Sequence, residues 1–282
     1  MLRRIRLDVP SLLSMLYAPL QPLVKRLHVT RRGTRRYAPA DVLLPTGYRA
    51  EIVADGLTAP VHGCFDVSGG LYVTEAGHKS DSPPRVVRID VSTGAGEVVV
   101  DLADRWTPTG AATGAAWHEG ALYLANTDTI LRIDLADGSI VELVTGLPGR
   151  GDHQTNHPIV GADTRLYWGQ GCVTNMGVVG ADNFGYEWLA ANPDVHDLPA
   201  TDVELVGRVY DQPDVLHNPL DRVPCSAYAP FGRGTDTTRV AGATVATGAV
   251  VSCELDGSDV RTEAWACATR MASRSTPTVA CS

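Results

Sequence analysis

FDVSGGLYV at residues 65–73, AWHEGALYL at 116–124 and VGADTRLYW at 160–168 repeat one pattern along the chain. In each, a turn containing glycine or a polar residue is followed by Leu-Tyr and a further apolar residue, which is typical of a β-hairpin. The tyrosines fall at positions 72, 123 and 167. We therefore interpret the three stretches as equivalent hairpins of an internal repeat.

A second hairpin follows each of these stretches. The second hairpins are RVVRIDVSTGAGEVVV from 85, ILRIDLADGSIVELV from 130 and VVSCELDGSDVRTEAW from 250. Repeats of roughly forty to fifty residues with four strands each are typical of β-propellers, in which a blade buries its faces against neighbouring blades. The sequence therefore predicts an all-β fold, a partial propeller with three blades.

Composition agrees with this fold class, because 28 glycines and 18 prolines against 4 methionines favour turns and short strands. We expect a basic extension over residues 1–43 and the partial propeller over 44–265. A long Gly-, Pro-, Asn- and Asp-rich insertion, at about 172–246, interrupts the third blade. Residues 48–54 are predicted to form a strand that the last blade borrows to close the ring.

Charge is distributed unevenly within the net charge of −8. Residues 1–36 contain nine Arg or Lys and one Asp, so the rest of the chain has 15 basic and 31 acidic side chains. An acidic body argues against nucleic acid as a partner, which requires clustered cations. The basic arm, whose middle at 12–17 is apolar, is expected to be a solvated, partly ordered extension, with membrane contact as the weaker alternative. It contains no clear signal peptide and no apolar run of about twenty residues.

Residues 266–282, ACATRMASRSTPTVACS, lack the apolar alternation of the hairpins. Back-translation in another reading frame gives a string that would begin a fourth blade and would contain an Arg-Asn pair. We therefore expect this tail to be out of frame, so that a frameshift near codon 266 truncates the propeller. Resequencing the gene across codons 255–300 tests this expectation.

The six cysteines, at 64, 172, 225, 253, 267 and 281, include no C-x-x-C pair that would indicate zinc or redox chemistry. A Cys225–Cys253 disulfide and buried single thiols are both compatible with the spacing.

Asp152 and His153 are adjacent in GLPGRGDHQTNHPIVGADTRLYWGQG at 146–171, where a turn-rich loop enters a predicted hairpin. An imidazole that is neutral near physiological pH is a suitable general base, and a neighbouring carboxylate stabilises its imidazolium and sets its tautomer. The pair could also cap a turn without any catalytic role.

This segment, with LYVTEAG at 71–77 and the blade spacing, resembles the quinoprotein soluble glucose dehydrogenases and their sorbosone dehydrogenase relatives. The resemblance implies a six-bladed propeller that oxidises an aldose or a sorbosone-like sugar. It also implies hydride transfer to pyrroloquinoline quinone (PQQ), the presence of calcium, a separate electron acceptor and an extracytoplasmic location. By the same resemblance His153 is the general base and Asp152 supports it. Three departures are the Arg-Asn pair expected after Trp265, which is missing, the lack of a glutamine near residues 109–113, and the absence of the later blades. Because those blades supply further cofactor and calcium contacts in that family, the truncation is expected to impair the activity of this chain.

Polar side chains follow the first hairpins at positions that face a propeller channel. Carboxylate and amide oxygens suit a hard cation such as calcium, so the candidate ligands are Glu75, Asn126, Gln170 and Asn175. This set supports an alternative function, a calcium-dependent sugar lactonase, which is also a six-bladed propeller. The chain lacks the N-terminal Gly-Glu-Gly-Pro-type motif of those enzymes.

A third interpretation is a non-catalytic propeller that binds a partner across one face, since fold does not determine function. The aromatic residues of the insertion would suit either a substrate lid or a partner surface; they are Tyr186, Trp188, Tyr210 and Tyr228. The histidines at 157, 196 and 217 lack metal-ligand spacing and are expected to be solvated.

Overall fold

Each pair of predicted hairpins forms a four-stranded antiparallel sheet. The structure is a computed structural model that describes residues 42–77, 82–107 and 109–265. The first sheet contains β1 (Pro60–Phe65), β2 (Leu71–Glu75), β3 (Arg85–Ile89) and β4 (Gly96–Asp101). The second contains β5 (Ala112–His118), β6 (Ala121–Asn126), β7 (Thr129–Asp134) and β8 (Ile140–Val144). The third contains β9 (Ile159–Val160), β10 (Leu166–Gln170), β15 (Ala249–Cys253) and β16 (Arg261–Trp265).

The second sheet is covered on both faces, and β6 shows this most clearly. Successive side chains of a strand point to opposite faces. Leu122 and Leu124 accordingly pack into an apolar cluster shared with the first sheet, whereas Tyr123 and Ala125 pack into a cluster shared with the third sheet. Every residue of β6 is buried as a result, so the strand reads as a continuous apolar run rather than an alternating one.

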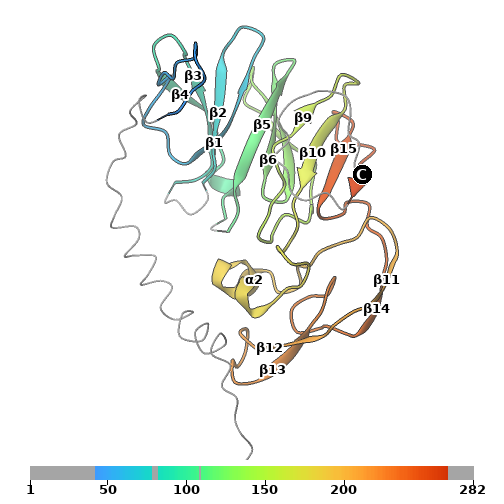
Figure 1. Ribbon diagram of the computed structural model, residues 1–282. Helices are drawn as coiled ribbons and strands as arrows, with labels where there is room; N and C mark the ends of the chain where they lie inside the picture. The colour runs from blue at the N-terminus through green and yellow to red at the C-terminus, as the bar shows by residue number, and fades with distance from the viewer. Residues whose placement is uncertain (1–41, 78–81, 108, 266–282) are drawn as a thin grey trace, which may run out of the picture.

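The three sheets stand side by side (Figure 1), with β5 in contact with β1 and β9 in contact with β5. The first strands of the three sheets are therefore neighbours at one edge of the stack. This arrangement is of the propeller type and confirms the predicted all-β propeller class.

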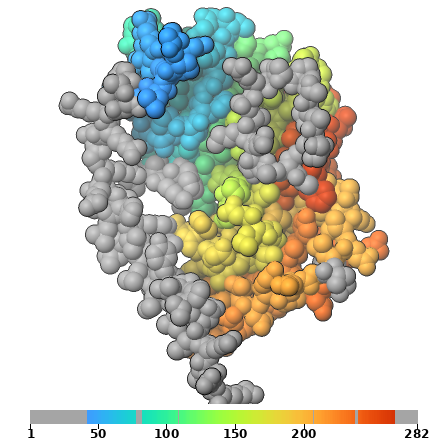
Figure 2. Space-filling view, in the orientation of Figure 1, coloured from blue at the N-terminus to red at the C-terminus, as the bar shows by residue number. Residues whose placement is uncertain are grey.

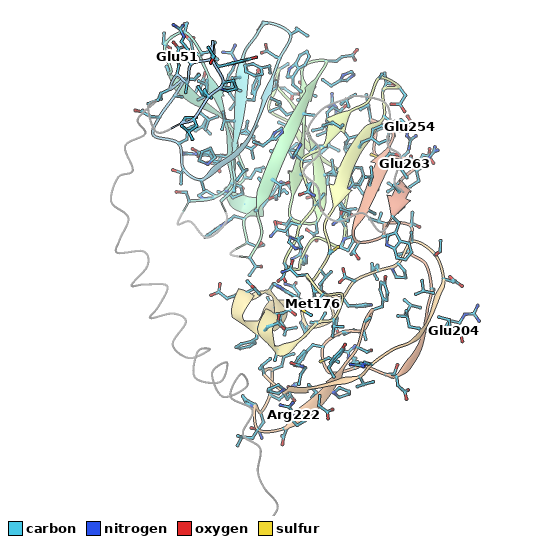
Figure 3. The ribbon with its side chains drawn as sticks, viewed as in Figure 1. Glu51, Met176, Glu204, Arg222, Glu254 and Glu263 are labelled. Carbon is cyan, nitrogen blue, oxygen red and sulfur yellow. The ribbon has the colours of Figure 1, made fainter. Side chains whose placement is uncertain are left out.

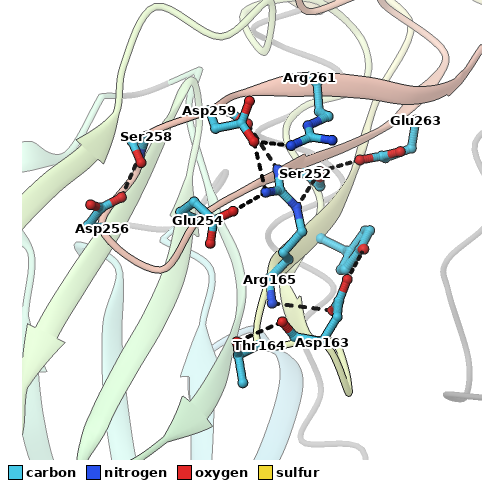
Figure 4. Close-up of polar contacts among 11 residues, drawn as sticks. Asp163, Thr164, Arg165, Ser252, Glu254, Asp256, Ser258, Asp259, Arg261 and Glu263 are labelled. Carbon is cyan, nitrogen blue, oxygen red and sulfur yellow. Dashed lines mark hydrogen bonds and ion pairs between the residues drawn. The ribbon is translucent and has the colours of Figure 1, made fainter.

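Arg165 connects the two hairpins of the third sheet, which are far apart in the sequence. Its side chain is only 11% exposed, and it pairs with Glu254 and with Asp259, the latter at 3.0 Å from Nη1 to Oδ2 (Figure 4). Nη2 also donates to the Ser252 hydroxyl at 3.0 Å. Charge-assisted hydrogen bonds of this kind are stronger than those between neutral groups. These contacts join two hairpins that are separated by 78 residues, since β10 ends at Gln170 and β15 begins at Ala249. They offset part of the entropy that is lost when so long a connection is closed.

The segment between β10 and β15 has its own small core, below the sheets in Figures 1 and 2. Its elements are η3 (Ala181–Tyr186), α2 (Trp188–Ala191), β11 (Val203–Val206) paired with β14 (Thr237–Val240), and β12 (Tyr210–Pro213) paired with β13 (Arg222–Cys225). A further short 3-10 helix, η2 (Ala103–Arg105), lies between the first and second sheets in the chain. The apolar cluster of the segment includes Val173, Trp188 and Phe231. We call this segment, residues 171–248, the insertion.

The prediction of a borrowed strand at residues 48–54 is wrong. These residues have no strand pairing and are mostly exposed, including Ile52 and Val53. Ala54 and Leu57 instead pack on the outer face of the first sheet, against a cluster that contains Val73 and Ile89. Of the predicted strand only Ala54 thus packs on a sheet face, and it does so without a hydrogen-bonded neighbour.

Cys225 and Cys253 are buried, unbridged thiols, so the disulfide alternative is wrong. Burial raises the pKa of Cys253 to about 11, which keeps it as the unreactive thiol. Among the described residues no helix has the length and apolarity that crossing a bilayer requires. Most of the basic extension predicted at 1–43, and all of the out-of-frame tail predicted at 266–282, lie outside the described residues.

Candidate functional site

The loop that carries Asp152 and His153 lies against the first residues of the insertion. Asp152 N donates to Val173 O at 2.8 Å, and His153 N donates to Cys172 O at 3.2 Å. A Cβ at Gly151 would lie 2.6 Å from Val173 O, so this close approach requires glycine there. On its other side the loop is tied to the second sheet, because Thr155 N donates to Thr127 O at 3.2 Å. The loop is therefore held between sheet and insertion.

His153 is partly exposed, and its ring contacts a side chain of the insertion. His153 Nε2 lies 2.7 Å from Asn175 Oδ1. An amide oxygen only accepts hydrogen bonds, so Nε2 carries the hydrogen and Nδ1 keeps the lone pair. Met176, next to Asn175, lies where the sheets meet the insertion (Figure 3). The ring is thus oriented at that junction, with one basic nitrogen.

Asp152 does not provide the hydrogen bond to His153 that we expected. Its carboxylate accepts from Trp188 Nε1 at 2.6 Å and from Asn183 Nδ2 at 3.1 Å, both in the insertion. Burial raises the pKa of Asp152, although these two hydrogen bonds and the charge of His153 act in the opposite direction. The Asp152 carboxylate points to the insertion because the two hydrogen-bond donors there compensate for the loss of its hydration. The orienting partner of His153 is Asn175, which we had considered only as a metal ligand.

Three of the expected calcium ligands have hydrogen-bond or ion-pair partners within the protein. Glu75 is 1% exposed and forms an ion pair with Arg85, and its Oε1 accepts from Thr58 N at 2.5 Å. Gln170 Oε1 accepts from Thr155 Oγ1 at 3.2 Å. Asn126 Nδ2 lies 3.5 Å from Arg105 O, at the limit of a hydrogen bond.

Glu75, Asn126 and Gln170 are the last residues of β2, β6 and β10, so they share a sheet position. However, the described residues contain no group of three or more His, Cys, Asp or Glu side chains that could hold a metal ion. The carboxylate with which a calcium site would begin is already neutralised by Arg85. The proposed ligand set is therefore unsupported.

His62 and His157 form a feature that the sequence did not reveal. Their rings stack with centroids 4.0 Å apart and an interplanar angle of 24°. His62 belongs to β1 and His157 precedes β9, and Gly114 of β5 lies against both. A Cβ on Gly114 would lie 2.6 Å from the Cβ of either histidine, so only glycine admits the stack. Burial, together with His157, lowers the pKa of His62 to about 4.

The expectation of a solvated His157 is therefore wrong, because its ring is stacked within the sheet stack. The one available signal was Gly114 inside a strand pattern, which often marks a close backbone approach. The other two histidines have local partners in the insertion. His196 Nδ1 lies 2.9 Å from Asp194 O, and the exposed His217 pairs with Asp214 at 3.0 Å.

The aromatic residues of the insertion differ in their environment. Trp188 is buried in the insertion core, whereas Tyr186 and Tyr210 are exposed. Trp188 therefore contributes to the core and donates a hydrogen bond to Asp152, whereas Tyr186 and Tyr210 lie on the surface.

No family model and no curated protein matches the chain. Solved structures with some similarity include a putative glucose dehydrogenase-type oxidoreductase from Thermus thermophilus, with 22% identity and a TM-score of 0.34 over 44% of this chain and 40% of that one. The PQQ-bound aldose sugar dehydrogenase from Streptomyces coelicolor has 14% identity and a TM-score of 0.37 over 75% of this chain and 83% of that one. TolB from Acinetobacter baumannii has 13% identity and a TM-score of 0.31 over 77% and 48%. The chain thus spans less than half of the first of these structures, and likenesses this low carry no conclusion about activity.

The residues beside His153 do not fit the three carboxylates of PQQ. Such a ligand needs cationic partners. The cation in this loop, Arg150, is already paired with Asp128 at 2.8 Å from Nε to Oδ2. The carboxylate of the loop, Asp152, would repel an anion. The described loop suits proton removal better than anion binding.

Proposed function

We propose that this propeller-type protein oxidises a sugar hydroxyl, in the manner of a quinoprotein sugar dehydrogenase, with His153 as the general base. The observation that carries the proposal is the partly exposed His153 ring held by Asn175 at 2.7 Å. A base that is both accessible and oriented is what proton removal from a bound hydroxyl requires. The substrate class, an aldose or a sorbosone-like sugar, follows from the resemblance of residues 146–171 to that family.

In this proposal the lone pair of His153 Nδ1 takes the proton of the substrate hydroxyl. The positive charge that then develops on the ring is stabilised by the Asn175 amide oxygen, which accepts the Nε2 hydrogen. Asp152 places a negative charge on the residue adjacent to His153. Its hydrogen bonds to Trp188 and Asn183 keep the loop in place. Asn175 and Asp152 are thus positioning residues in this mechanism.

PQQ, when bound, would supply the hydride acceptor. The described loop does not hold its carboxylates, so we derive no step through the cofactor. From the resemblance we also propose a separate electron acceptor, which would reoxidise PQQ, and an extracytoplasmic location. The lactonase alternative is weaker, because Glu75, the carboxylate of its metal site, is bound to Arg85.

The test is reduction of an artificial electron-accepting dye by the full chain with added PQQ and a panel of aldoses. We expect His153→Gln to lower the rate by about 10²- to 10⁴-fold, the usual contribution of a general base. His217→Gln, which changes an exposed histidine of the insertion, is the matched control and should leave the rate unchanged. A wild-type chain that reduces no dye with any aldose contradicts the proposal. Calcium-dependent lactone hydrolysis would favour the lactonase instead.

Asn175→Asp tests the orientation of the ring separately. A carboxylate in place of the amide favours the imidazolium, and only the neutral ring can act as base. We therefore expect the acidic limb of the pH–rate profile to move to higher pH. An unchanged profile would remove Asn175 from the mechanism.

A further inference from the structure

A cavity of about 240 Å³ lies next to the loop that carries His153, between the second sheet and the segment before it. The residues that line it include Asn126 and Leu131 of the second sheet, together with Arg105, Glu142 and Arg150. Arg150 is three residues before His153. The cavity is smaller than the roughly 300–1,000 Å³ of pockets for drug-sized ligands, so it suits one small polar unit.

One wall of the cavity is held in a strained backbone conformation. Thr127 has φ +58°, and a β-branched residue rarely adopts positive φ. Thr127 and Asp128 form the two-residue turn between β6 and β7, a type of hairpin turn that takes positive φ at its first residue. Two hydrogen bonds hold this turn. Thr127 N donates to Ala111 O at 2.8 Å, and Thr127 O accepts from Thr155 N at 3.2 Å. Strained residues of this kind gather at ligand sites, where the surrounding structure over-determines them. The turn at Thr127 is thereby hydrogen-bonded to the loop that carries His153.

The polar groups of the cavity favour a neutral, polyhydroxylated ligand. Arg105 pairs with Glu142, and Arg150 pairs with Asp128. Asp104 also lines the cavity, so three carboxylates face two guanidinium groups there. The resulting excess of one negative charge disfavours a phosphate or a carboxylate. Ion-paired carboxylates and guanidinium groups still have lone pairs and N–H groups for hydroxyls.

Uncharged polar groups complete the set. Thr107 and Thr129 line the cavity with Asn126. Asn126 is nearly buried, yet within the described part of the chain its side-chain amide has one hydrogen bond, at the limiting distance of 3.5 Å to Arg105 O. A hydroxyl group of a ligand would form the remaining hydrogen bonds of this amide.

We propose that the cavity is a binding subsite for a neutral sugar unit, which lies beside His153 and selects saccharides over anionic ligands. This inference rests on the proposed function for the class of substrate, but sugar binding at the cavity can be measured without any turnover. Three residues of chain span at most about 11 Å, so a saccharide of two units is long enough to contact both Arg150 and the region of His153.

The experiment is calorimetric titration of the full chain with maltose, gluconate and inorganic phosphate. We expect maltose to bind, and the other two to bind at least tenfold more weakly. Asp104→Asn and Arg150→Gln each change an exposed side chain and each remove hydrogen bonds to a sugar. We expect either change to weaken maltose binding about tenfold, the effect of losing a hydrogen bond to a charged group. Arg222→Gln, on an exposed strand of the insertion, is the control and should bind as the wild type does.

Equal binding of maltose by Asp104→Asn, Arg150→Gln and the wild-type chain overturns the subsite. Tighter binding of phosphate or gluconate than of maltose overturns its preference for neutral ligands. His153→Gln separates this inference from the proposed function. If that variant still binds maltose and still reduces dye at the wild-type rate, the proposed function fails while the subsite stands.

Discussion

The three sheets and the insertion reach stability by different routes. In the sheets, side chains on opposite faces of a strand pack against the two neighbouring sheets, as Leu124 and Tyr123 of β6 do. In the insertion, short elements surround a small core, and buried carboxylates hold it together. Asp197 accepts from Val173 N at 2.7 Å, and Asp152 accepts from Trp188 Nε1 at 2.6 Å. Packing between sheets therefore stabilises the first region, whereas the second combines a small apolar core with hydrogen bonds to carboxylates.

Leu124→Ala should have the largest effect, because its side chain is fully buried between the first and second sheets. Truncation of such a residue removes apolar contact and leaves a cavity, which costs about 2–5 kcal/mol. Urea unfolding monitored by circular dichroism measures the change. Val141→Ala, on the exposed side of β8, is the control with an expected change near zero. A small effect of Leu124→Ala would mean that the sheets do not share a core.

Gly114→Ala should destabilise the sheet stack by about 3 kcal/mol, from strain and overpacking together. Its φ is +146°, and the added Cβ would meet both stacked histidines. Gly120→Ala is the comparison, since the Cβ there meets no atom within 4 Å and only its φ of +79° is unfavourable. The difference between the two variants in thermal unfolding gives the part of the stability loss that comes from the steric clash. Equal losses would show that the histidine stack can move aside.

Trp188→Phe keeps an aromatic ring in the insertion core but removes the donor to Asp152. Because Asp152 is partly buried, losing this donor should cost about 2 kcal/mol. The loss should appear in the insertion, as faster amide hydrogen exchange there than in β6. Trp106→Phe, which removes a donor to Gly77 O at a more exposed position, is the control. Equal acceleration of exchange in both regions would contradict the contrast between them.

Acidification should weaken the sheet stack through His62. The folded state lowers the pKa of His62 from 6.5 to about 4, so the unfolded chain binds the proton more tightly. Stability from this group is complete above pH 6.5 and is lost as the pH falls from 6.5 towards 4. The partly exposed ring is screened by solvent, which reduces the contribution to about 1 kcal/mol. The stability of His62→Phe should depend less on pH over this range, as measured by urea unfolding at several pH values.

The candidate site could be predicted only in part. The adjacent Asp152 and His153 were found because a turn-rich loop before a hairpin is a local signal. Their partners were not found, because Asn175 and Trp188 come from a segment whose path no local pattern describes. The same limit explains Glu75, whose ion pair with Arg85 arises from the register of β2 against β3.

Sequence alone determined the all-β class and the repeated pair of hairpins, since alternation and turn residues act over a few neighbouring positions. It also identified His153 as a candidate base. Tertiary structure alone decided that His62 stacks on His157 over Gly114, and that Asp152 binds the insertion rather than His153. It also determined that Thr127 forms one wall of a polar cavity. The reason is physical: these contacts join groups that are distant in the chain, and their energies depend on burial and geometry that exist only after the sheets and the insertion have packed together.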